Sequence, residues 1–154
     1  LVMNSGLAFE AEQFDWLSHE IARTNGKPVA LFLHKPVFLN LPDDPEAPET
    51  SIRYVPQPAR ARLIEMFAHI DLRLIASGHV HQRRDFTHRH TRHVWAPSAG
   101  FVINDARQDR IGIKEVGLVE YRFRPDSFEV RHVRAAGQRD VDIEELLALM
   151  DGEP

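Results

Sequence analysis

The stretch Leu74-Ile75-Ala76-Ser77-Gly78-His79-Val80-His81 carries the strongest signal for the fold of this chain. Its first half is apolar, as expected for a buried strand, and the strand pattern stops at a glycine followed by two histidines. A second apolar run, residues 29–33, is followed directly by His34. Two strands that each end in a histidine predict a metal site at the edge of a sheet, where ligands bind in open α/β folds.

The sequence around these two strands alternates between strand and helix patterns. A strand is expected over residues 1–4, and a helix is expected over residues 9–23. The apolar positions of that helix, at three- and four-residue steps, are Phe14, Leu17 and Ile21. A second helix is expected to begin near Pro58, because proline suits the first turn of a helix. Strands that alternate with helices pair in parallel through right-handed crossovers.

The C-terminal half has a different periodicity. Residues 119–123 and 128–132 alternate between apolar and polar around Pro125-Asp126, which predicts a β-hairpin. Asp142 is expected to cap a last helix. The apolar positions of that helix are Ile143, Leu146, Leu147 and Met150. We therefore predict an α/β fold, a mixed sheet with flanking helices and an antiparallel C-terminal hairpin, with residues 1–154 forming a single domain.

The composition is that of a globular protein, with 154 residues, 43% hydrophobic and 27% charged. A formal net charge of −4 argues against nucleic acid as the main partner. No apolar run approaches the roughly 20 residues of a membrane span. Cysteine is absent, so a metal would be bound by histidine, carboxylate, asparagine or carbonyl groups. We expect a cytoplasmic location, with which the lack of cysteine is compatible.

His34 and His79 are expected to lie side by side if their strands are neighbours, because the strand axes are then about 4.8 Å apart. Two imidazoles so placed can bind one ion through bonds of about 2.0–2.1 Å. His81 can chelate the same ion or bind a second ion about 3.5–4 Å away. The spacing in the sequence leaves both arrangements open.

Three other histidine frameworks fit less well. Metallo-β-lactamase-like hydrolases need an Asp-His pair soon after their His-x-His, and no such pair follows His81. Barrel amidohydrolases need more than about 200 residues. Cupin-type sites need a glutamate a few residues later, whereas the first acidic residue after His81 is Asp85.

Three segments resemble the C-terminal half of the calcineurin-like metallophosphoesterase family. Residues 13–17, Gln-Phe-Asp-Trp-Leu, are similar to the helix before the fourth motif of the family. Residues 31–36, Leu-Phe-Leu-His-Lys-Pro, are similar to its strand-His-x-Pro motif, and residues 77–81, Ser-Gly-His-Val-His, are similar to its Gly-His-x-His motif. The resemblance covers roughly residues 1–105, and the Gly-His-x-His segment is its most specific part.

This resemblance implies a sandwich of two mixed sheets that holds two divalent ions, usually Mn, Fe or Zn. It implies that His34 and His79 bind one ion and that His81 binds the other. A hydroxide held by the metals would attack the phosphorus of a small phosphoester substrate, while the ions neutralise the phosphoryl oxygens.

The sequence departs from this family in its other motifs. It contains no Asp-x-His, Gly-Asp-x-x-Asp or Gly-Asn-His segment, so the bridging carboxylate and the histidine that assists the leaving group are missing. We therefore assign no catalytic residue in this chain. We expect the chain to be the C-terminal half of such an enzyme, or a truncated relative, with weak or no activity by itself.

Residues 83–93 are rich in arginine and histidine. A phosphate-facing strand or an additional metal site is one interpretation, and a solvated strand face is the one we favour. If the segment is a single strand, His88, His90 and Arg92 share one of its faces.

Residues 38–57 contain four prolines and show no regular periodicity. Loops of this length in compact domains are usually functional or disordered. The loop can cap a pocket, in which case Arg53 or Tyr54 would contact the leaving group of a substrate.

The sequence leaves two functions open. One is hydrolysis of phosphoesters with two metal ions, and the other is a non-catalytic interaction module that keeps the fold with an incomplete metal site. If half of the sandwich is missing, the strand at residues 1–4 is a candidate unpaired edge. We therefore expect self-association through this edge.

Overall fold

The structure is a computed structural model that describes residues 1–3, 11–38 and 53–152. Within these ranges the chain forms two compact units. The first unit is Leu1–Val80 with Asp85–Val94, and the second unit is His81–Arg84 with Trp95–Pro154. That residues 1–154 form a single domain stays a prediction.

The first unit is built on a five-stranded sheet with the strand order β1-β2-β3-β5-β4, of which only the end residues Arg84 and Trp95 are counted in the second unit. The strands are β1 (Val2–Met3), β2 (Val29–Leu33), β3 (Leu72–Ser77), β4 (Arg84–His88) and β5 (Thr91–Trp95). β2 pairs in parallel with both β1 and β3, and Leu31 lies level with Ile75. The parallel pairing predicted from the alternation of strands and helices is confirmed.

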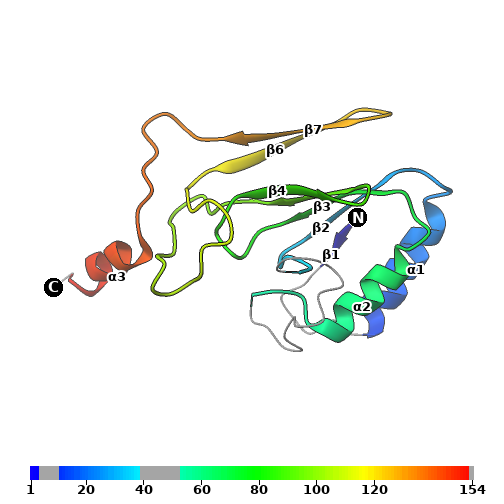
Figure 1. The fold of residues 1–154 in the computed structure, drawn as a ribbon, viewed down its shortest axis with the longest axis horizontal. Coiled ribbons are helices and arrows are strands. Elements are labelled where there is room, and N and C mark those ends of the chain that lie inside the picture. The colour runs from blue at the N-terminus through cyan, green and yellow to red at the C-terminus, as the bar shows by residue number, and fades with distance from the viewer. Residues whose placement is uncertain (4–10, 39–52, 153–154) are drawn as a thin grey trace. The chain divides into compact units, whose positions relative to one another are not determined.

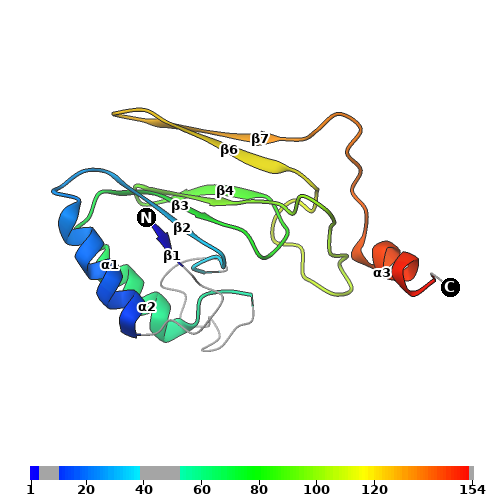
Figure 2. The same ribbon diagram turned by 180° about the vertical axis from the view of Figure 1, so that it is seen from behind.

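Two helices connect the three parallel strands and lie on the same side of the sheet (Figures 1 and 2). They are α1 (Ala11–Arg23) and α2 (Gln57–Met66). The helices contact each other where the guanidinium group of Arg62 lies 4.1 Å from the centre of the Phe14 ring. Successive right-handed crossovers in one direction place both helices on one face. The mixed sheet with flanking helices is thus confirmed.

The core of the first unit lies between this helical layer and the sheet. Alternate residues of β2 face the helices, because successive side chains of a strand point to opposite faces. The core side chains of these elements include Met3, Phe14, Leu17, Val29, Leu31, Leu33, Leu63, Leu72 and Ile75. The register between β2 and β3 shifts between Val29 and Ala30, which lets Leu72 and Ile75 reach the same core.

β1 forms one edge of the sheet. Among the described residues no strand pairs with its outer side, and Val2 is 76% exposed. The predicted edge position is therefore confirmed for Val2–Met3, while residue 4 lies outside the described residues. Self-association through this edge stays a prediction.

β4 and β5 are joined by the two-residue turn Arg89-His90, so they run antiparallel. Residues 83–93 do not form a single strand, and the predicted solvated strand face is wrong for His93. The turn interrupts the segment, so that His88 and Arg92 lie on different strands. In addition, His93 is only 5% exposed. This segment is a folded hairpin with a buried side.

The second unit contains an antiparallel hairpin, formed by β6 (Leu118–Phe123) and β7 (Phe128–Val133). Tyr121 lies opposite Val130. Cross-strand ion pairs such as Arg131 with Glu120, at 2.5 Å, lie on its exposed side. The hairpin predicted from the period of two is confirmed.

The helix α3 (Ile143–Asp151) follows Asp142, whose side chain accepts a hydrogen bond from the N–H of Glu144 at 2.9 Å. The predicted cap is therefore confirmed. The apolar side of this helix stays largely exposed, since Leu147 and Met150 are 37% and 73% exposed. None of the helices in the described ranges has the length and apolar character needed to cross a bilayer.

A buried glutamine fixes part of the second unit. Gln82 is 1% exposed, and its Nε2 donates to Gln108 Oε1 at 3.0 Å and to the carbonyl oxygen of Asp109 at 2.9 Å. Its Oε1 accepts from the N–H groups of Ile111, at 2.8 Å, and Gly112, at 2.7 Å. All four hydrogen-bonding positions of the amide are thus used. They hold a loop against the segment that contains the second histidine of the Gly-His-x-His motif.

Candidate metal centre

His34 and His79 follow the neighbouring strands β2 and β3. The parallel register pairs Phe32 with Ala76, and two residues further on the N–H of Gly78 donates to the carbonyl oxygen of His34 at 2.9 Å. His34 and Gly78 therefore lie level with each other just beyond the strand ends. The sequence predicted a site at this edge of the sheet, where the carboxyl ends of parallel strands meet.

A tight turn directs the chain at His79. The N–H of Val80 donates to the carbonyl oxygen of Gly78 at 2.7 Å, which closes a three-residue turn around His79 with φ of 64°. This sign of φ belongs to the rare and strained form of the γ-turn. Gly78 itself has no positive φ, so the histidine carries the strained conformation. Such strain in a residue with a side chain is concentrated at functional sites.

The side chains of the two histidines are in direct contact. His79 Nδ1 lies 2.8 Å from His34 Nε2, and the ring centroids are 4.6 Å apart with an interplanar angle of 66°. In this hydrogen bond one ring nitrogen donates and the other accepts. His34 is exposed and His79 is half-buried, so the pair is accessible from solvent.

The same separation suits a shared metal ion. Two nitrogens bound at about 2.0–2.1 Å are about 2.9 Å apart at a right angle and about 3.3 Å apart at the tetrahedral angle. The 2.8 Å between His79 Nδ1 and His34 Nε2 is close to the first of these values. The separation of these two nitrogens is therefore compatible with adjacent ligand positions of one ion, which would lie off the line that joins them.

His81 belongs to the second unit. Its ring centroid lies 4.7 Å from that of Phe101, and its φ is 54°. Over the described ranges, no group of three or more histidine, aspartate or glutamate side chains is arranged to hold a metal ion. That His81 is a metal ligand stays a prediction.

Two residues that support the segment around His81 were not among the site residues predicted from the sequence. Gln82 holds this segment to its loop through four hydrogen bonds, and Phe101 packs against the His81 ring. The position of Gln82 directly after the motif was the available signal. For Phe101 there was none, because a contact between distant positions of the chain leaves no local pattern.

Arg53 and Tyr54 lie shortly before α2 and are half-buried. The next residue, Val55, is 1% exposed, and its N–H donates to the carbonyl oxygen of Pro36 at 2.9 Å. This bond holds Val55 beside Pro36, so the chain on either side of the predicted capping loop is tied together. Residues 39–52, and with them most of the predicted capping loop, lie outside the described residues. Contact of Arg53 or Tyr54 with a substrate stays a prediction.

Comparison with known proteins does not assign the chain to a family. No protein-family model and no curated protein matches the sequence. One solved structure with a similar fold is a "putative 5′-nucleotidase" from Staphylococcus aureus in complex with alpha-ketoglutarate, at 11% sequence identity and a TM-score of 0.45. The match covers 98% of this chain and 30% of that protein. A similarity this low does not establish a shared activity.

Proposed function

We propose that His34 and His79 bind one divalent metal ion in the active site of a phosphoester hydrolase. The observation that carries this proposal is the 2.8 Å contact between His79 Nδ1 and His34 Nε2. The contact occurs just beyond the ends of two neighbouring parallel strands. The strained backbone of His79, with φ of 64°, supports it further.

The two histidines would each offer one neutral imidazole nitrogen, a ligand that suits Mn, Fe and Zn. The hydrogen bond from Gly78 to the carbonyl oxygen of His34 and the turn around His79 hold the two residues in place. Because the rings already meet, little side-chain freedom would be lost when an ion binds. We propose His81 as a ligand of a second ion. A pair of bound divalent ions supplies a hydroxide nucleophile and neutralises phosphoryl oxygens.

The remaining parts of such a site are absent from this sequence. It has no Asp-x-His, Gly-Asp-x-x-Asp or Gly-Asn-His segment that would supply carboxylate ligands and the leaving-group histidine. We propose that these groups come from a segment outside this sequence, and that the chain alone is weakly active or inactive. The proposed substrate is a small phosphoester, with Arg53 and Tyr54 near its leaving group. The proposed location is the cytoplasm, with which the lack of cysteine is compatible.

The test is hydrolysis of p-nitrophenyl phosphate with added Mn²⁺, by protein expressed from the complete reading frame that includes this sequence. His34→Ala and His79→Ala should each lower kcat/KM by at least about 100-fold, because each removes a metal ligand. His69→Ala, at an exposed position, should leave kcat/KM unchanged. Full activity in the His79→Ala protein would contradict the proposal.

A non-catalytic interaction module with an incomplete metal site is the second candidate. The observation in its favour is the lack of the three other family motifs in this sequence. It predicts no phosphoester hydrolysis by the complete protein with Mn²⁺, Fe²⁺ or Zn²⁺. It also predicts that His79→Ala has no effect on activity.

A further inference from the structure

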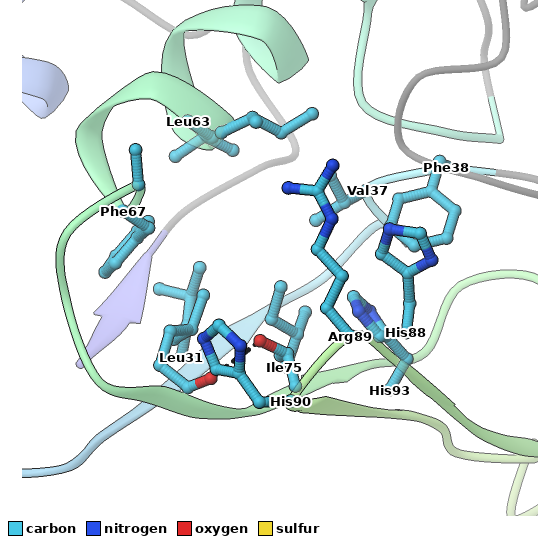
Figure 3. A pocket seen from close by; sticks show the side chains of 14 residues that line it. Leu31, Val37, Phe38, Leu63, Phe67, Ile75, His88, Arg89, His90 and His93 are labelled. Carbon is cyan, nitrogen blue, oxygen red and sulfur yellow. Dashed lines mark hydrogen bonds between the residues drawn. The ribbon is translucent and has the colours of Figure 1, made fainter.

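The first unit contains a pocket between α2 and the β4–β5 turn, with a volume of about 200 Å³ (Figure 3). Neither His34 nor His79 lines it. Its apolar lining includes Leu31, Val37, Leu63, Phe67, Leu72 and Ile75. Apolar cavities of about 150 Å³ bind benzene in another protein, so this pocket is large enough for one aromatic ring or a short aliphatic chain.

One side of the pocket is basic. His88, Arg89 and His90 line it from the turn between β4 and β5. Figure 3 shows the side chain of Arg89 extending away from the sheet, toward the side of the pocket formed by α2. Thr91, which also lines the pocket, donates from Oγ1 to the carbonyl oxygen of Leu72 at 2.7 Å. This bond ties the turn to β3 and fixes the basic side above the apolar floor.

The charge of Arg89 is not balanced within the described part of the chain. No carboxylate of the described residues pairs with it, and no acidic residue of these ranges lines the pocket. Two other arginines nearby in the sequence form ion pairs. Arg92 Nη2 lies 2.7 Å from Asp85 Oδ2, and Arg73 Nη2 lies 2.8 Å from Asp71 Oδ2. The pocket therefore combines an apolar floor with an uncompensated guanidinium group, which favours an apolar molecule that carries a negative charge.

The wall next to this basic side is firmly packed. His93 is 5% exposed, its ring stacks on Phe86 with centroids 5.0 Å apart, and it lies 4.8 Å from the centroid of Phe38. A preformed wall favours binding, because few side chains have to be ordered when a ligand enters.

We propose that this pocket binds a small apolar carboxylate, an aromatic ring or short chain with one carboxylate group. The apolar part contacts Leu63, Phe67 and Ile75, and the carboxylate pairs with the planar guanidinium of Arg89, whose geometry matches two carboxylate oxygens. A single negative charge fits because Arg89 is the one permanently charged residue of the described part of the chain that lines the pocket. This binding function does not depend on the proposed metal site.

Titration of ¹⁵N-labelled chain with phenylacetate, followed by NMR, tests the proposal. Saturable shifts are expected at the amides of Ala68 and Thr91, which line the pocket, with a dissociation constant on the order of 1 mM, as expected for about ten non-hydrogen atoms. Phenylacetamide, which has the same shape without the charge, should bind about tenfold more weakly. Arg89→Gln should weaken phenylacetate binding by the same factor and leave phenylacetamide binding unchanged.

Two further variants separate this pocket from other sites. Ala68→Phe places a ring at an exposed residue that lines the pocket, so it should abolish binding of both molecules. His34→Ala should leave phenylacetate binding unchanged, whether or not the metal proposal holds. Equal affinity for the two molecules, unchanged binding in Ala68→Phe, or no saturable shifts would each overturn the proposal.

Discussion

The N–H of Val80 donates to the carbonyl oxygen of Gly78 at 2.7 Å, and the turn that this bond closes holds His79 at φ of 64°. His81 also has a positive φ, of 54°. Both histidines of the Gly-His-x-His segment thus adopt a backbone conformation that residues with a Cβ rarely occupy. Placing the imidazoles in this way costs stability, which is a common compromise at functional sites.

We predict that the His79→Gly chain is more stable than the His79→Ala chain by about 1 kcal/mol, because glycine adopts positive φ without the Cβ penalty. Urea unfolding at equilibrium measures this difference. The matched pair His69→Gly and His69→Ala should show the opposite order, since His69 has no positive φ. Equal stabilities of the two His79 variants would show that no strain is stored there.

Gln82→Ala should destabilise the second unit by about 2–4 kcal/mol, because it leaves the partners of four hydrogen bonds without their glutamine. Hydrogen exchange should accelerate most at the amides of Ile111 and Gly112, which lose their acceptor. Gln82→Glu keeps an acceptor oxygen for these two amides and should protect them better than alanine does, although its second oxygen faces Gln108 Oε1 and the carbonyl oxygen of Asp109 in place of a donor. Unchanged exchange at both amides in Gln82→Ala would contradict the role of this side chain.

Gly112→Ala should destabilise the chain by about 1–3 kcal/mol. A Cβ at this position would lie 2.5 Å from the carbonyl oxygen of Arg83, which accepts a hydrogen bond from the N–H of Ile113 at 2.9 Å. The control is Gly100→Ala, where a Cβ meets nothing within 4 Å, so stability should stay the same or rise by up to about 1 kcal/mol. Equal unfolding midpoints for the two variants would count against the close approach at Gly112.

Asp140 provides a pH-dependent contribution to stability. The N–H of Val116 donates to Asp140 Oδ1 at 2.8 Å, and this hydrogen bond lowers the pKa of the carboxyl group below its usual 3.8. The ion pair between Arg134 Nη2 and Asp140 Oδ1, at 2.9 Å, lowers this pKa further. Because the folded-state pKa is lowered, the stabilisation is present above the unfolded-state pKa and is lost as the pH falls through the folded-state pKa.

We therefore predict that Asp140→Asn lowers stability at neutral pH by up to about 1 kcal/mol, since the group is largely exposed. The difference from the unmodified chain should shrink between about pH 5 and about pH 2. Urea midpoints measured across this range test it. A difference that stays constant with pH would rule out the charge of Asp140 as its cause.

The main elements of the fold were predictable because their signals are local. The spacing of Phe14 and Leu17 marks the buried side of α1, and both residues are in the core. The apolar run of β2 likewise predicted one strand. The alternation of apolar and polar residues predicted β6 and β7. Asp142 caps α3 by accepting a hydrogen bond from the N–H of Glu144, two residues later, and a contact this local is specified by a short motif.

The β4–β5 turn was not predictable in the same way. Two-residue hairpin turns usually contain glycine, asparagine or aspartate, whereas this one is Arg89-His90, with Arg89 at φ of 55°. Because basic residues lie on both sides of the turn, the sequence pattern did not mark where the turn occurs. The burial of His93 against Phe38 and Phe86 depends on packing between distant positions, which residue type alone does not indicate.

The candidate site was predictable in part. Parallel pairing of two strands that each end in a histidine brought His34 and His79 together, as expected from the sequence. The turn around His79 had no sequence signal, because positive φ is expected at glycine and the adjacent Gly78 does not adopt it. The place of His81 against Phe101 in the second unit also depended on tertiary packing.

Binding of Zn²⁺ to the chain, measured by isothermal titration calorimetry, tests the pairing of His34 with His79 most directly. We predict a site that takes one ion per chain, with an affinity that falls at least about tenfold in both His34→Ala and His79→Ala and stays unchanged in His69→Ala. Zn²⁺ affinities of the His34→Ala and His79→Ala chains equal to that of the unmodified chain would contradict the metal site.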